Sequence, residues 1–350
     1  MSSSTTSSHA SERDNALGHR ASDRHTVAIT GACSFLGANL VGMLEGDDAI
    51  RRIVCLDRQA PKTAGSKSRV YELDLTSPSA EERLAEIFGA EGVDTVVHLA
   101  FLSSPTHTSA WVHELESVGT MQVLNACRRS RVRKIVMWSL TLLYGAHPTN
   151  PNFLSEKHPL RSPRQEPFFQ DKLSAEAEVL RFGKAGRGLV ATVLRTAPIL
   201  GPTVENFLTR YLSHRFVPTV LGFDPLWQCL HEADAVSALR LAILRDAPGI
   251  FNITGDGVLP LHTVIRLAGR TALPLPRSLT KGLASALWVA QFGEAPPSFV
   301  DFLQYLCVAD GSAAQRVLGF RPVYTSREAV IEFSSAQRLR DVRLLSESPA

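Results

Sequence analysis

The chain has 350 residues, of which 44% are hydrophobic and 20% are charged, and its formal net charge is +3. This is the composition of an ordinary globular protein, and the small, evenly spread charge argues against a nucleic-acid-binding surface. The five cysteines stand far apart without metal-ligand spacing, so we expect reduced thiols, no metal site and a cytoplasmic protein.

Residues 1–25 differ in amino-acid composition from the rest of the chain. Positions 2–8 are all Ser or Thr, and almost no large apolar residue precedes Val27. Such a segment cannot bury a core and is predicted to be disordered. It lacks the apolar run of a secretory signal, and its acidic residues are atypical of an organellar transit peptide.

The stretch Thr26–Leu40 predicts a buried strand, a tight glycine turn and the start of a helix. Gly31 and Gly37 bracket the turn, which lets a backbone approach a pyrophosphate at the helix N-terminus. The middle position, where a third glycine is usual, holds Ser34. Its Cβ crowds that approach, while its hydroxyl could donate to the phosphate.

A second predicted strand, Ile53–Leu56, ends in Asp57, twenty residues after Gly37. A carboxylate at this place accepts hydrogen bonds from the adenosine ribose and repels a 2′-phosphate, which favours NAD. Arg58 follows directly and could accommodate that phosphate, so NADP stays open as the alternative.

Further strands and helices alternate along the chain. The predicted strands are 70–73, 93–99, 134–139, 189–194, 227–230 and 249–253, and the predicted helices are 79–88, 111–129, 168–182, 206–212, 232–244, 261–269 and 278–291. The alternation indicates an α/β, Rossmann-type doubly wound parallel sheet over residues 26–200. Residues 201–335 are expected to form a smaller substrate lobe with returns to the main sheet, and 336–350 a flexible tail.

The apolar stretch Leu283–Phe292 is too short to span a membrane. We interpret it as core packing or as a lid over a pocket, with membrane contact left open as the alternative, and we expect no stable membrane insertion.

Several motifs, in order, resemble one family. They are TGACSFLG from Thr30, Asp57, Asp74-Leu75, HLAF from His98, VGTMQVLNA from Val118, SLTLLYG from Ser139, KLSAE from Lys172, LRTAPILGP from Leu194, HEADAV from His231 and LGFRP from Leu318. From Thr26 to about Phe333 the chain is similar to the extended short-chain dehydrogenases/reductases, which include NAD-dependent epimerases, dehydratases and 3β-hydroxysteroid dehydrogenases.

The resemblance implies a cofactor site. Asp57 and Asp74 would hold the adenosine half, Ala100 and Phe101 would line the cofactor path, and Lys172 would hold the nicotinamide ribose. The complete set it implies is Gly31, Ser34, Phe35, Leu36, Gly37, Asp57, Arg58, Asp74, Leu75, Ala100, Phe101 and Lys172.

The catalytic positions depart from the family. Its chemistry needs a tyrosine four residues before the lysine and a Ser or Thr after the fifth strand, but these positions hold Phe168 and Leu140. Neither side chain can transfer a proton. A helix asparagine is replaced by Glu116. Lys172 remains, and Thr141 is the expected substitute hydroxyl; Ser139, Tyr144, His158, Glu166 and Asp171 are further candidates nearby.

Two hypotheses about function follow. In the first, the chain is an NAD(P)-dependent oxidoreductase or epimerase with a non-standard proton relay, and its small-molecule substrate is a sugar nucleotide, a steroid-like ring or another alcohol or carbonyl compound. In the second, it is an inactive nucleotide sensor or accessory subunit. A homodimer is compatible with either.

Overall fold

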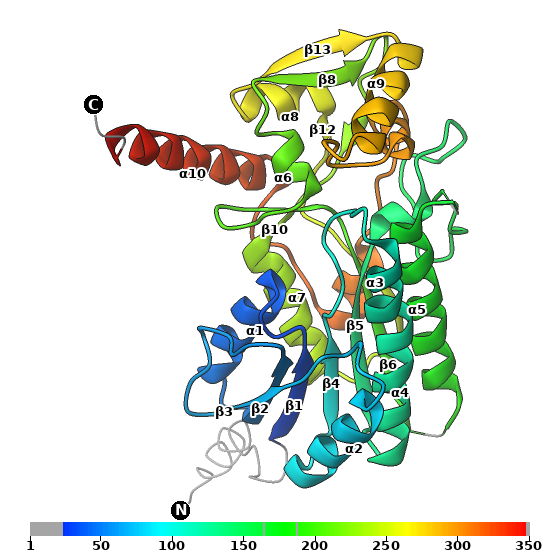
Figure 1. Cartoon of the computed structure of the whole chain (residues 1–350), viewed down its shortest axis with the longest axis vertical. Helices are drawn as coiled ribbons and strands as arrows, with labels where there is room; N and C mark the ends of the chain where they lie inside the picture. The colour runs from blue at the N-terminus through cyan, green and yellow to red at the C-terminus, as the bar shows by residue number, and fades with distance from the viewer. Residues whose placement is uncertain (1–23, 164, 187, 348–350) are drawn as a thin grey trace, which may run out of the picture.

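The computed structural model describes residues 24–347, apart from 164 and 187 (Figure 1). Residues 1–23, for which disorder is expected, lie outside this range, as do the last three residues of the chain. His25 already belongs to the first strand and bonds Asp94 at 3.1 Å, so the ordered chain begins slightly earlier than predicted.

Seven parallel strands form the central sheet, in the order β11-β6-β5-β4-β1-β2-β3. This confirms the predicted doubly wound α/β fold. The strands are β1 (His25–Thr30), β2 (Ile50–Asp57), β3 (Ser68–Glu72), β4 (Thr95–His98), β5 (Lys134–Leu140), β6 (Val190–Thr196) and β11 (Gly249–Ile253). The strand order reverses between β1 and β4, and ligands of such sheets bind beyond the carboxyl ends at that point.

Helices cover both faces of the sheet (Figure 1). On one face α1 (Phe35–Glu45) packs against α7 (Glu232–Leu244), and on the other α4 (Gly119–Arg129) lies between α2 (Ala80–Glu91) and α5 (Pro167–Lys184). Strand β5 is buried along its whole length and β1 from Thr26 to Thr30. Their continuous apolar character is that of strands covered on both faces.

The helix predicted over 111–129 is divided into three parts. Helix α3 (Ser109–His113) leads into a π-helical turn, η1 (Glu114–Val118), and then into α4. A Cβ on Gly119, at the junction, would lie 3.3 Å from Cβ of Leu75, so the junction packs closely under the sheet edge. The wide turn carries Glu116 into the interior, where it is fully buried. Such π turns frequently stand at functional sites.

The remaining elements form a second lobe at the carboxyl end of the sheet (Figure 1). They are η2 (Thr141–Tyr144), β7 (Ile199–Leu200), α6 (Phe207–Tyr211), β8 (Phe216–Val220), β9 (Leu226–Trp227), β10 (Leu230–His231), β12 (Leu259–Pro260), α8 (Leu261–Leu267), β13 (Thr271–Leu275), α9 (Arg277–Val289) and η3 (Pro297–Leu303). The turn η4 (Ala314–Leu318) instead packs on α7 and β11 of the main sheet. Strand β11 and helix α7, from this half of the sequence, return to the main sheet.

Helix α10 (Ser326–Glu347) extends into the segment 336–350, for which a flexible tail is expected. Ala329, Val330 and Phe333 anchor its first turns in a second apolar core. No Gly or Pro interrupts residues 326–347, so nothing in the sequence stops the helix once it has started.

The interpretation of Leu283–Phe292 as core packing is wrong. Helix α9 leaves Leu283 and Leu287 exposed, and Phe292 just beyond it is 83% exposed. Of the described helices, none combines the length and apolar character needed to cross a bilayer.

The turn between β1 and α1 is a close backbone crossing. Gly31 has φ of +70°, and a Cβ on it would lie 2.8 Å from the backbone N of Ala100, at the end of β4. A Cβ on Gly37 would lie 2.2 Å from the carbonyl oxygen of Gly31. Both glycines are therefore required by the chain's own packing, whether or not a ligand approaches the turn.

Gly37→Ala is expected to lower the free energy of unfolding by about 3 kcal/mol, because the new methyl group must displace backbone. Gly89→Ala in α2 is the matched control, since a Cβ there meets nothing within 4 Å. It should raise the free energy of unfolding by about 0.5–1 kcal/mol through helix propensity. Urea denaturation measures both, and equal effects of the two substitutions would contradict the packing described for the turn.

Candidate functional site

The first turn of α1 supplies donors at the carboxyl end of β1. Ser34 is its N-cap, and the Ser34 hydroxyl accepts from the backbone N–H of Gly37 at 3.1 Å. The hydroxyl proton of Ser34 stays available to a ligand. The N–H groups of Phe35 and Leu36 have no carbonyl one turn earlier in the helix. Together these groups form an anion-binding helix start, the arrangement that a pyrophosphate requires.

A polar groove beside this turn is lined by Cys33, Asp57, Arg58, Gln59, Glu72, Leu73 and Asp74. Asp57 accepts from the backbone N–H groups of Cys33 at 2.8 Å and Arg58 at 2.7 Å, so it ties the end of β2 to the glycine turn. Nε of Arg58 lies 3.9 Å from Asp74. Hydrogen bonds from Thr76 hold the pKa of Asp74 below its usual value. The residues expected at the adenosine end thus lie together, and their carboxylates are the kind of acceptor that ribose hydroxyls require.

From the glycine turn a narrow crevice of about 90 Å³ runs toward the end of β5. Its lining includes Ser34, Phe35, Leu36, Phe101 and Leu140. Ala100 is buried against Gly31. The structure therefore brings the predicted cofactor residues of both halves of the sheet to one edge, where a dinucleotide would lie.

Lys172 is 1% exposed, and its ammonium donates to both carboxylate oxygens of Glu116, at 2.8 and 2.9 Å. Glu116 also accepts from the backbone N–H of Leu102 at 2.7 Å. The Phe168 ring covers the ammonium, with 4.0 Å between Nζ and the ring centroid. Burial lowers the pKa of Lys172 and raises the pKa of Glu116. The lysine is thus held by a carboxylate and an aromatic face where the family would place a phenol.

Leu140 ends β5 and faces the crevice, so the position of the usual serine hydroxyl is apolar. Thr141 begins the next turn and is 2% exposed. Its carbonyl accepts from the thiol of Cys307 at 3.6 Å. Thr141 is therefore adjacent to the lost serine in the chain but enclosed by protein.

Ser139 and Tyr144 belong to a buried polar network. Ser139 donates to Glu176 at 2.9 Å, and Glu176 pairs with Arg195. Arg195 donates to the phenol oxygen of Tyr144 at 2.9 Å, and Tyr144 donates to Asn252 at 2.8 Å. Ser139 and Tyr144 are thus structural groups that join β5, β6 and β11.

Asp171, Glu166 and His158 lie apart from the crevice. Asp171 is bonded by His113 at 2.7 Å and by Ser117 at 2.9 Å, and Glu166 accepts from Ser298 at 2.9 Å. His158 is partly exposed and packs edge-on toward Tyr144. None of the three is among the described residues that line the crevice.

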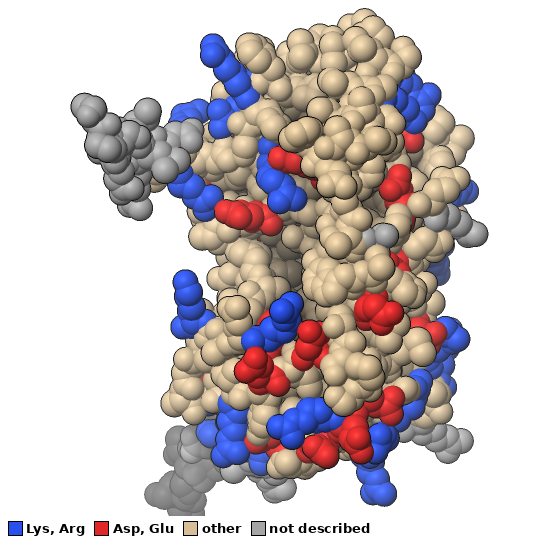
Figure 2. All heavy atoms as spheres, viewed as in Figure 1, with Lys and Arg blue, Asp and Glu red and all other residues tan. Residues whose placement is uncertain are grey.

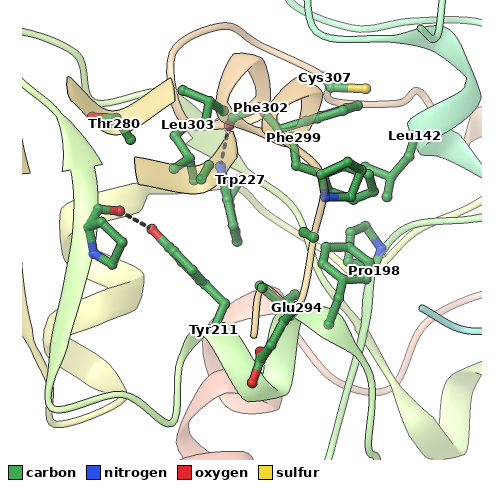
Figure 3. Close-up of a pocket in the computed structure, with 18 of the residues that line it drawn as sticks. Leu142, Pro198, Tyr211, Trp227, Thr280, Glu294, Phe299, Phe302, Leu303 and Cys307 are labelled. Carbon is green, nitrogen blue, oxygen red and sulfur yellow. Dashed lines mark hydrogen bonds between the residues drawn. The ribbon is translucent and has the colours of Figure 1, made fainter. Parts of the chain in front are cut away.

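A larger cavity of about 280 Å³ lies in the second lobe, bounded by α6, β9, α9 and η3 (Figure 3). It shares Leu142, Pro198 and Phe207 with the crevice, so the two adjoin. Two of its polar side chains already have partners, because Tyr211 donates to the carbonyl of Pro218 at 2.7 Å and Trp227 to that of Phe302 at 3.1 Å. What remains is a mostly apolar pocket beside the expected position of the nicotinamide.

Neither the Glu116–Lys172 pair nor the wall of this cavity is predicted from the sequence. One signal points to the pair: a carboxylate replaces the helix asparagine in the same chain that replaces the tyrosine. The lining of the cavity comes from segments between 142 and 307, and no local pattern brings these together.

The sheet, the glycine turn and the polar groove define a dinucleotide-binding protein of the short-chain dehydrogenase/reductase type. A family model described as the NAD dependent epimerase/dehydratase family matches residues 27–254. The chain belongs to this family, which confirms the predicted family and, with it, NAD as the family's cofactor.

Relatives match over most of the chain. An uncharacterised protein of Mycobacterium tuberculosis is 32% identical over 323 residues, covering 90% of this chain and 85% of that protein. A 3-diazoavenalumate denitrifying reductase of Streptomyces is 27% identical, covering 86% and 97%. Sterol demethylase protein B of Methylococcus capsulatus is also 27% identical, covering 86% and 94%.

Among solved structures, MoeE5 in complex with UDP-glucuronic acid and NAD superposes with a TM-score of 0.70 at 24% identity. The match covers 90% of this chain and 99% of MoeE5. At that identity the likeness establishes the fold, in agreement with the strand order described above.

Glu116→Gln is expected to lower the free energy of unfolding by about 3–5 kcal/mol, because it leaves the Lys172 ammonium buried without a counter-charge. The double variant Glu116→Gln with Lys172→Met removes both charges and should recover most of the loss. Glu178→Gln, which breaks the exposed pair with Arg181 on α5, is the control and should cost less than about 1 kcal/mol. A double variant less stable than Glu116→Gln alone would contradict the role of this pair.

Proposed function

We propose that the protein is an NAD-dependent oxidoreductase whose substrate is an apolar alcohol or carbonyl compound bound in the cavity under α9. The observation that carries the proposal is the adjacency of this apolar cavity to the crevice between the glycine turn and Leu140. A reacting carbon at the junction near Leu142 would lie next to the cofactor, while the rest of the substrate fills the cavity.

The lining argues for an apolar substrate over a sugar nucleotide. Among the described residues that line the cavity, Glu294 is the only acidic or strongly basic one, and His214 lies beside it. A nucleotide diphosphate needs cationic or N–H donors, and a carboxylate repels it. The similarity to a sterol demethylase component and to a reductase is in keeping with this substrate class.

The residues present fit the cofactor. Phe35 and Leu36 would donate backbone N–H groups to the pyrophosphate, Asp57 and Asp74 would accept from the adenosine half, and Ala100 and Phe101 would border the path. When bound, NAD supplies or accepts the hydride. The Lys172 ammonium has three protons, of which Glu116 takes two. Since Lys172 is 1% exposed and the Phe168 ring covers its ammonium, the third proton would reach a ribose hydroxyl only if that ring moved aside.

The proton is the unusual part of the proposed chemistry. Reduction of a carbonyl requires a proton at its oxygen, and Phe168 and Leu140 supply none. Thr141 directly follows the lost serine position, so we assign to its hydroxyl the polarisation of the substrate oxygen. Because Thr141 is 2% exposed and does not line the crevice, η2 would have to turn this hydroxyl toward the substrate, and water would supply the proton. Without a phenol the reaction should be slow. The ion pair of Glu116 and Lys172 would hold the site in place but would not transfer the proton.

A second candidate is a protein that binds the dinucleotide and does not turn it over. The observation that favours it is the enclosure of Lys172 between Glu116 and the Phe168 ring. Phe168 occupies the position of the family's tyrosine, so no side chain there can donate a proton. Turnover with an apolar ketone distinguishes the two.

The first test uses the purified chain with NADH and a panel of steroid ketones and long-chain ketones, and separately with NAD and UDP-glucose. We expect slow NADH-dependent reduction of apolar ketones, and neither oxidation nor epimerisation of UDP-glucose in the presence of NAD. Turnover of UDP-glucose would refute the apolar substrate class. NADH binding without any turnover would select the second candidate.

Phe168→Tyr together with Leu140→Ser should rebuild the family's catalytic groups. A general acid contributes about 10²–10⁴-fold, so the rate of ketone reduction should rise by at least the lower of these factors. Phe169→Tyr, on the neighbouring ring of the same helix, is the control and should not raise the rate. A brisk native rate that falls in the double variant would show that another group has taken the acid's role, with Thr141 the first to mutate.

Asp57→Asn tests the preference for NAD over NADP. The amide oxygen can still accept from the backbone N–H of Cys33, but the amide NH2 replaces the oxygen that accepts from Arg58, so one hydrogen bond is lost together with the negative charge that would repel a 2′-phosphate. We expect NADH to bind more tightly than NADPH to the native chain, and the variant to narrow that gap. Glu72→Gln, in the same groove, serves as the control for charge alone. If the native chain bound NADPH more tightly than NADH, Arg58 and not Asp57 would determine the cofactor preference.

A further inference from the structure

Helix α9 presents an apolar face to solvent. Leu279, Leu283 and Leu287 are 55%, 45% and 41% exposed, and Val289 is 79% exposed. Thr280 is the only residue of the helix that is buried. A helix packed on a core shows the opposite arrangement, with its large apolar side chains inside.

This face continues over neighbouring elements. Strand β8 lies beside α9 and pairs with β13, so the three elements form one end of the second lobe (Figure 1). More than half of the large hydrophobic side chains that are exposed among the described residues belong to this end. They are Phe216, Leu221, Phe223, Leu226, Leu273, Leu279, Leu283, Leu287, Val289 and Phe292, and we call them the apolar cap. Concentrated exposure of this kind marks an interaction surface.

The charges around the apolar cap are mostly basic. From Arg270 to Gly293 the chain contains Arg270, Arg277 and Lys281 and no acidic residue, and Arg215 stacks over the Phe216 ring at 5.5 Å. Three acidic residues also border the cap. Asp301 pairs with Arg277 and Lys281, Glu294 lies near Arg210 and His214, and Asp224 lies near His262. Figure 2 shows a broad uncharged area at this end of the molecule, flanked by Lys and Arg and, along its lower margin, also by Asp and Glu, whereas charges of both signs crowd the opposite end.

The apolar cap is continuous with the cavity. Leu283, Leu287 and Phe292 belong to the cap and also line the cavity, so α9 separates solvent from the pocket by the thickness of one helix. Trp288 of the same helix stacks on His107, in the loop after β4, with ring centroids 3.8 Å apart. The helix is thus a lid that reaches from the second lobe to the edge of the crevice.

We propose that the apolar cap docks on the surface of an anionic lipid bilayer, with α9 lying in the interface and the cavity opening toward the acyl chains. A short helix rich in Leu and Trp, flanked by Lys and Arg, has the composition of interfacial helices. Basic residues at the rim attract anionic headgroups. A second copy of this chain would instead bring the basic rims of two caps together, which is unfavourable.

The test is co-sedimentation of the full chain with vesicles, performed without cofactor so that it is independent of turnover. The probes are vesicles of phosphatidylcholine alone and of phosphatidylcholine mixed with phosphatidylglycerol. We expect binding to the mixed vesicles, weaker binding to the neutral ones, and weakening by salt. Absence of binding to both would overturn the proposal.

The variant Leu279→Gln with Val289→Gln removes cap side chains that do not line the cavity. The control, Val317→Gln with Val323→Gln, changes residues that are 52% and 80% exposed, which matches Leu279 and Val289, but that lie on η4 and on the segment before α10. Partitioning should fall at least tenfold in the cap variant and stay unchanged in the control. Equal partitioning of both variants would overturn the proposal.

The native chain provides a measurement that does not depend on the folding of a variant. Vesicles that contain brominated phosphatidylcholine should quench the tryptophan fluorescence of the native chain, and absence of quenching would overturn the proposal. Trp288→Phe then serves as a separate assignment, because it should remove most of that quenching. If the cap variant instead converts a dimer to a monomer in size-exclusion chromatography while the native chain ignores vesicles, the cap is an interface between copies and the proposal fails.

Discussion

The close crossing of the β1–α1 turn over the end of β4 is the constraint on which the rest of the structure depends. A single extra carbon on Gly37 would stand 2.2 Å from a backbone oxygen, and Gly31 needs a left-handed conformation beside Ala100. This crossing fixes where α1 begins, so its first N–H groups point into the crevice. Asp57 then secures the turn from the end of β2. The chain's own packing therefore shapes the dinucleotide-binding edge of the sheet.

The Glu116–Lys172 pair compensates for the absence of the family's tyrosine. Loss of the tyrosine leaves Lys172 without the group whose pKa it would lower, and an isolated ammonium at 1% exposure would be costly. Glu116 provides a counter-charge from the π-helical turn, and the Phe168 ring provides a polarisable face. The two substitutions form one physical unit, because each makes the other tolerable. The buried pair therefore satisfies the charge of Lys172 without the tyrosine that the family usually places beside it.

The second lobe combines an apolar cavity with an apolar outer face. The cavity walls come from α6, β9, α9 and η3, and their polar atoms largely satisfy one another, which leaves an apolar interior. The same helix that roofs the cavity exposes Leu279 and Val289 to the outside. An apolar substrate, an apolar pocket and an apolar docking face are mutually consistent, since a molecule that fits the pocket concentrates in a bilayer.

The sequence by itself determined the fold, the glycine turn, the acidic end of β2 and the absence of the catalytic hydroxyls at positions 140 and 168. These features depend on residues that are neighbours in the chain, or on strand-helix alternation, so local geometry encodes them. Only the tertiary structure decided that Lys172 pairs with Glu116, fifty-six positions away, and that Ser139 and Tyr144 are held in a network with Arg195. It also decided that α9, which could equally have been a core helix, lies on the outside. Periodicity shows which face of a helix is apolar, but whether protein or solvent meets that face depends on how distant segments pack.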